Sequence, residues 1–151
     1  MTQSMSFSAL PDPETQSEFY SGVAFKRLVA WFIDVLVVFL MTAVVATLPL
    51  FVGWFFFPLL FLVINFIYRL ASISSRSATW GMRIMNIELR NKDGAHLETS
   101  EALLHTAAYL VASSFFLPQV ISMILMLVSE RGQGLHDMLC GTTAIRRPSN
   151  Y

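Results

Sequence analysis

The chain of 151 residues is 55% hydrophobic, carries charged side chains at only 13% of its positions and has a formal net charge of zero. Soluble domains carry about a quarter charged residues, disordered chains combine low hydrophobicity with high net charge, and nucleic-acid-binding proteins show a basic surplus, so the composition argues against all three classes. A mean hydropathy of +0.59 indicates instead a small integral membrane protein, long enough for three or four hydrophobic passes.

Two apolar runs in the first half of the chain predict a helical hairpin. The run 28–48 is interrupted by a single charge, Asp34, and would be about 31 Å long as a helix, enough to cross a bilayer. A break at Pro49 leads to the second run, 50–70, which ends in Tyr68-Arg69. An aromatic residue followed by a cation is typical of a membrane interface.

The polar linker at 72–101 changes the pattern. Apolar and polar residues alternate around Ile87, and Asp93-Gly94 is a favoured turn because glycine adopts positive φ at little cost. We therefore expect a short amphipathic β-hairpin over residues 83–98. Glu101 then places an acid in the first turn of the next helix.

A third apolar stretch, 102–129, is interrupted by Pro118. As one helix it would be about 42 Å long, too long for an untilted span, and neither half is long enough to cross alone. A single crossing would place Arg131 and the cations after it outside, against the positive-inside rule, whereas a kinked or re-entrant pair of half-helices would keep them inside. We expect both termini on the cytoplasmic side, with the number of crossings left open.

Asp34 is the most informative single residue. It lies about 10 Å along the predicted helix from Arg27, and a separation of seven residues puts the two on nearly the same face. A charged carboxylate inside a membrane costs a few kcal/mol unless it is paired, protonated or hydrated. Asp34 is therefore a candidate proton- or cation-binding site, with a structural ion pair or hydrogen-bonded carboxyl as the equal alternative.

The segment around His136 and Asp137 places an imidazole and a second acid at the membrane surface. His136 and Cys140 have i, i+4 spacing, but two ligands do not make a closed zinc site, and one cysteine allows neither a disulfide nor a multi-thiolate site. No nucleophile elbow accompanies them. We expect no metal, no cofactor and no enzymatic activity.

Short motifs in a fixed order carry a family resemblance. Arg27 opens the first predicted helix and Asp34 lies in its middle, residues 79–83 read Thr-Trp-Gly-Met-Arg, and residues 135–142 read Leu-His-Asp-x-Leu-x-Gly-Thr. This order resembles the RDD family of small bacterial membrane proteins, named for one arginine and two aspartates. The resemblance covers about residues 22–147, with residues 1–21 as a flexible polar tail and 148–151 as a C-terminal tail. It departs from the family at two positions: Met82 replaces a lysine, and His105 stands where an arginine often begins the next helix.

The resemblance implies a transport-related protein of the bacterial inner membrane, with ion or proton exchange suggested for some members. Arg27, Asp34 and Asp137 are the ion-binding or ion-pair candidates, and His136 and Arg83 are secondary ones. Arg27 and Asp137 could form a switchable pair or, as we favour, a static clip that holds the C-terminus on the first helix.

The alternative function is a non-transporting accessory or assembly subunit of a larger membrane complex. The expected partners are the lipid bilayer and either a second copy of this chain or another membrane protein, with no nucleic acid. The predicted fold class is an all-α integral membrane protein: a helical hairpin plus a third, Pro-interrupted hydrophobic segment, three or four membrane helices in all, with a short amphipathic β-hairpin in the polar linker.

Overall fold

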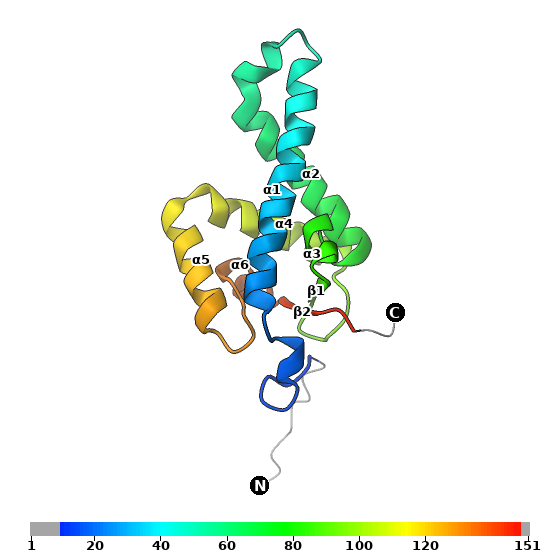
Figure 1. Ribbon diagram of the computed structural model, residues 1–151, viewed down its shortest axis with the longest axis vertical. Helices are drawn as coiled ribbons and strands as arrows, with labels where there is room; N and C mark the ends of the chain where they lie inside the picture. The colour runs from blue at the N-terminus through cyan, green and yellow to red at the C-terminus, as the bar shows by residue number, and fades with distance from the viewer. Residues whose placement is uncertain (1–9, 149–151) are drawn as a thin grey trace.

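The computed structural model describes residues 10–148, so residues 1–9 and 149–151 of the two predicted tails lie outside the described residues. The elements follow in the order η1 Ser17–Phe19, α1 Val23–Thr47, η2 Val52–Phe56, α2 Phe57–Arg76, α3 Trp80–Ile84, β1 Ile87–Arg90, α4 Thr99–Ser114, α5 Phe116–Val128, α6 Leu135–Cys140 and β2 Thr143–Arg146. The predicted fold class is confirmed: the chain is mostly helical, with a helical hairpin, a broken third segment and a small antiparallel sheet (Figure 1).

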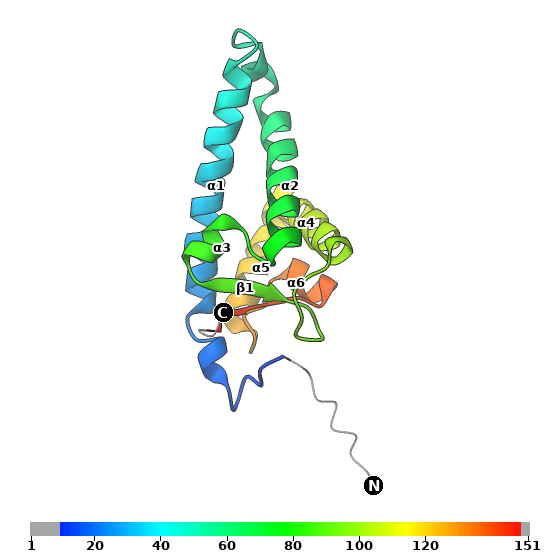
Figure 2. The same ribbon diagram turned by 90° about the vertical axis from the view of Figure 1, so that its right-hand side faces the viewer.

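Helices α1 and α2 form the long hairpin, whose distal half projects beyond the rest of the molecule (Figures 1 and 2). Segments Ser17–Thr47 and Val52–Arg76 are each long and apolar enough to cross a membrane. At the tip, a Cβ on Gly53 would lie 2.6 Å from the backbone of Ala46, so only glycine lets the two segments approach this closely. The chain is therefore a multi-pass membrane protein.

Helices α4 and α5 form the broken third segment. They qualify as a span only together, and they are bent by 116° relative to each other. The bend lies at Phe115, not at Pro118. Pro118 occupies the first turn of α5, where a missing N–H leaves no helical hydrogen bond unmade, so the proline fits inside the helix that it was expected to end.

The strand at Ile87–Arg90 and its antiparallel pairing are present, but the predicted β-hairpin over 83–98 is wrong about the partner. Strand β1 pairs with β2, Thr143–Arg146, from the other end of the chain. The residues after the Asp-Gly turn are held elsewhere: Asn91 Oδ1 accepts the N–H groups of Asp93 and Ala95, and Leu97 N donates to Ser77 Oγ at 2.6 Å. Residues 91–98 therefore form a loop that leads into α4.

The sheet, α3 and α6 cover one end of the hairpin (Figure 2). A core of buried apolar side chains lies there, including Ala30 of α1, Ile73 of α2, and Ile87 and Leu89 of β1. The described ends of the chain also meet there, because Arg146 Nε donates to Ser21 O at 2.8 Å. This capped end positions the polar residues described next.

Candidate functional site

A cavity of about 290 Å³ lies among α1, α2, α4, α5 and α6 at the capped end of the hairpin. Its lining combines ionisable and polar side chains with an apolar wall. The polar lining residues are Arg27, Asp34, Arg69, Tyr109, Gln119, Ser122 and His136. Three of the sequence-predicted candidates, Arg27, Asp34 and His136, therefore border one space.

Arg27 and Asp137 form a buried ion pair. Arg27 Nη1 lies 2.5 Å from Asp137 Oδ2, and their side chains are 6% and 0% exposed. Arg27 comes from the buried face of α1, and Asp137 lies in the first turn of α6, where its carboxylate also accepts the N–H of Gly134 at 3.0 Å. Arg27 additionally donates to Gly132 O at 3.1 Å. The pair joins α6 and the loop before it to the first membrane helix.

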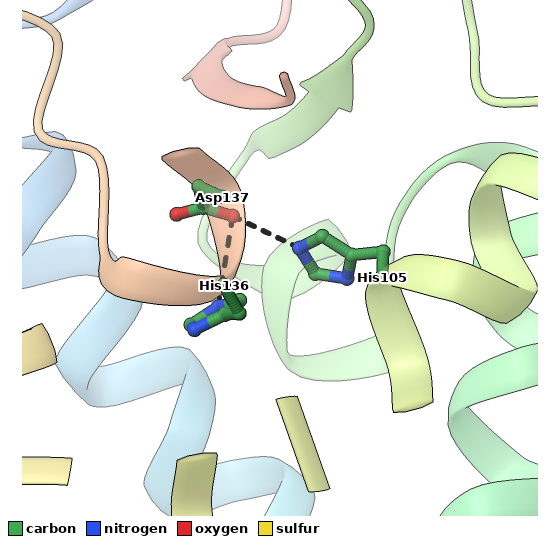
Figure 3. Close-up of side chains that lie close together, drawn as sticks. All are labelled: His105, His136 and Asp137. Atoms are coloured by element: carbon green, nitrogen blue, oxygen red, sulfur yellow. Dashed lines mark hydrogen bonds and ion pairs between the residues drawn. The ribbon is translucent and has the colours of Figure 1, made fainter. Parts of the chain in front are cut away.

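Two histidines, His105 and His136, lie beside Asp137 of this ion pair (Figure 3). His105 Nε2 lies 2.9 Å from Asp137 Oδ1, which also accepts the hydroxyl of Thr142 at 3.3 Å. Burial alone would raise the pKa of Asp137, but Arg27, His136 and His105 more than reverse this and hold that pKa well below its usual range. Burial lowers the pKa of His136 to about 3, so its imidazole is neutral at pH 7.

His105, His136 and Asp137 also have the geometry of a metal site, since one ligand atom from each lies within 4.8 Å of the others. The surrounding charge does not fit a cation. The Arg27 guanidinium contacts Asp137 and lies 3.5 Å from His136 Nε2, so a fixed positive charge already occupies this position. A divalent ion would first have to displace Arg27 from both partners.

Asp34 is not part of the Arg27–Asp137 ion pair and accepts three hydrogen bonds from other residues. Its carboxylate accepts the Tyr68 hydroxyl at 2.6 Å, the Thr79 hydroxyl at 2.6 Å and the Gly81 N–H at 2.8 Å. A Cβ on Gly81 would collide with Ala30 O, so only glycine lets α3 approach α1 this closely. Asp34, 4% exposed, thus links α1 to α2 and α3.

Arg83, the remaining candidate, is not brought to the cavity. Its Nε donates to Ala78 O at 3.2 Å and its Nη2 to Ser72 O at 3.3 Å, which ties α3 to the end of α2. Burial, with help from nearby Arg76 and Arg147, lowers the pKa of Arg83.

Sequence reasoning missed two charged or ionisable residues of the site. His105 was noted only as a departure from a family pattern, and Arg69 was assigned to the membrane interface. Arg69 is instead 3% exposed, with its guanidinium carbon 3.6 Å from the centre of the Tyr109 ring. The apolar run ends at residue 70, but α2 continues to Arg76, which places Arg69 about 10 Å inside the helix.

The RDD family matches residues 22–141, a range that contains α1 to α6 and every candidate residue. No curated protein and no solved structure matches the chain.

Proposed function

This chain belongs to the RDD family, and we propose that it is a small transport protein that exchanges ions, or couples their movement to protons, through the cavity beside α1. The observation that carries the proposal is the cavity itself, about 290 Å³ in volume, with Arg27, Arg69 and Asp34 on its wall. Ionisable residues at membrane depth are costly and mark ion or proton pathways.

Asp34 supplies a two-state element for such coupling. Its carboxylate accepts hydrogen bonds from Tyr68 of α2, from Thr79 just before α3 and from the Gly81 N–H of α3. A protonated carboxyl is a weaker acceptor, so proton binding would loosen α3 and Tyr68 from α1. Proton occupancy of Asp34 would thereby shift the population between a closed and an opened arrangement of the cavity wall.

The test is proton movement in proteoliposomes that contain a trapped pH dye, with outward gradients of Na⁺, K⁺, Cl⁻ and a small organic anion, benzenesulfonate, applied in turn. We expect wild-type protein to move protons in response to one of these gradients and Asp34→Asn to lose that response while remaining monodisperse. Asp93→Asn, the same change at an exposed acid, is the matched control. An unchanged response in Asp34→Asn would remove Asp34 from the mechanism.

The distribution of basic residues supports a proposal for the orientation of the protein in the membrane and for its location. The ten basic residues lie outside the hairpin tip, Leu48–Phe56, which carries no Lys or Arg. By the positive-inside rule, the capped end faces the cytoplasm of a bacterial inner membrane. In a Cys140→Ser background, a cysteine placed at Leu50, which is 88% exposed, should react with an impermeant maleimide added outside. Reaction only from the cytoplasmic side would reverse the orientation.

One observation favours the alternative of an accessory subunit. A groove beside the hairpin is lined by apolar side chains but also by Asn65, Ser113 and Ser114. Small and hydrogen-bonding residues typically mark contacts between membrane helices. The mass of the protein extracted from native membranes into nanodiscs separates the two functions: a homo-oligomer supports transport, and a defined complex with another protein supports the accessory role.

A further inference from the structure

Arg69 is a buried cation without a protein counterion. Its side chain is 3% exposed, yet no hydrogen bond or ion pair joins it to any residue between 10 and 148. Its guanidinium carbon lies 3.6 Å from the centre of the Tyr109 ring, a contact with an aromatic face that supplies no counterion. The other buried arginine on this wall, Arg27, shows the usual solution, since it contacts Asp137 at 2.5 Å.

An arrangement of this kind is unfavourable unless a ligand completes it. A buried charge is normally paired and hydrogen-bonded, and a guanidinium offers five N–H donors. Nε of Arg69 is fully buried without a partner and is therefore closed to the cavity as well. The residue lines the cavity, and no hydrogen bond joins Nη1 or Nη2 to any residue between 10 and 148, so these two groups carry the donors available to an acceptor there.

The neighbouring acids do not serve as that acceptor. Both oxygens of Asp34 are held by donors from α2 and α3, and Asp137 is saturated by Arg27, His105 and backbone. His136 also faces the cavity, as a neutral imidazole at pH 7. The cavity thus offers one positive charge whose hydrogen-bond donors are unused.

The rest of the wall suits an apolar body. Its apolar lining includes Leu28 and Trp31 of α1 and Met123, Met126 and Leu127 of α5. The volume of about 290 Å³ is just below the ~300 Å³ at which typical ligand pockets start, so the cavity suits a small ligand. Methionine is flexible and polarisable, so this wall can adjust to ligands of different shape.

We propose that the cavity binds a monovalent organic oxyanion with an apolar body, and that Arg69 holds the anionic group. A carboxylate or the phosphodiester of an anionic lipid has this chemistry, because guanidinium groups bind such oxygens in a bidentate fashion. The inference deepens the proposed function by naming the substrate class of the same cavity, and it rests on that function only for the step from binding to transport.

The test is equilibrium binding by calorimetry to the full chain in detergent, which requires no flux. The probe is benzenesulfonate, a small anion of fixed charge, and benzenesulfonamide is its neutral analogue of the same shape. Dihexanoyl phosphatidylglycerol and dihexanoyl phosphatidylcholine form the lipid arm. Arg69→Gln is compared with Arg76→Gln, the same change at an exposed position of the same helix, and with Arg69→Lys, which keeps the charge.

We expect saturable binding of an anion that weakens about tenfold or more in Arg69→Gln, less in Arg69→Lys, and not in Arg76→Gln. Binding of benzenesulfonate identifies a free organic anion, whereas binding of phosphatidylglycerol alone identifies a lipid headgroup. If wild-type protein bound neutral benzenesulfonamide as tightly as benzenesulfonate, the proposal would be overturned. This comparison does not depend on the folding of any variant. The absence of saturable binding of either anion would also overturn the proposal. Failed proton movement with intact anion binding would instead count against the proposed function.

Discussion

The Arg27–Asp137 pair gives the sharpest prediction about stability. Both side chains are almost fully buried and their charged atoms are 2.5 Å apart. Removing one partner of a buried pair costs about 3–5 kcal/mol, because the other charge stays buried without compensation. The loss of stability in Arg27→Met should lie at the lower end of this range, since His105, Thr142 and Gly134 still donate to Asp137. The loss in Asp137→Asn should lie at the upper end.

The double variant, Arg27→Met with Asp137→Asn, isolates the interaction energy between the two side chains. Once both charges are gone, no uncompensated charge remains, so we expect a combined loss smaller than the sum of the single losses by about 2 kcal/mol or more. Unfolding by SDS titration in mixed micelles measures each loss, and Arg76→Met, at an exposed position, controls for removing any arginine. Single losses below about 1 kcal/mol, or strictly additive losses, would refute the clip between α6 and α1.

Three further predictions concern the neighbouring contacts. Gly81→Ala places a Cβ 2.9 Å from the Ala30 carbonyl carbon and should destabilise the protein by about 1–3 kcal/mol in the same titration; a neutral result would show that α3 does not dock as described. Tyr68→Phe removes a 2.6 Å hydrogen bond to Asp34 and should cost about 1.5–3 kcal/mol, whereas a cost below 0.5 kcal/mol would contradict the role of that bond. The pKa of His136 is 6.5 in the unfolded chain but about 3 in the folded protein, so the unfolded chain binds the proton first and stability falls as pH drops between these values. From pH 7 to 5, wild-type protein should lose about 2 kcal/mol more than His136→Gln, and parallel pH profiles of melting temperature would exclude this effect.

The membrane hairpin was predictable because a long apolar run leaves few alternatives. The sequence also placed Arg27 and Asp34 on one helical face, and both lie on the buried face of α1. The contact between Arg27 and Asp137 was a hypothesis about residues that the family resemblance singled out, because no local pattern links the two positions. The surroundings of this ion pair could not be predicted from the sequence, because the positions of His105 and Thr142 depend on how α4 and α6 pack.

The errors have physical causes of the same kind. Alternation around Ile87 predicts a strand but does not identify its partner, and Asn91 diverts the chain after the turn. Pro118 indicated a break but is tolerated in a first helical turn, so the bend lies at Phe115. Arg69 was assigned to the interface because a cation near the end of an apolar run usually lies there, while its buried position depends on Tyr109.

Transport of an organic anion through the cavity beside Arg69 can be measured by counterflow. Proteoliposomes preloaded with unlabelled benzenesulfonate are diluted into radiolabelled benzenesulfonate, a permanently charged probe, and accumulation of label is followed over time. We expect transient accumulation with wild-type protein and Arg76→Gln, and its loss with Arg69→Gln. Accumulation that is equal in Arg69→Gln and wild-type protein, or indistinguishable from that in protein-free liposomes, would contradict this expectation.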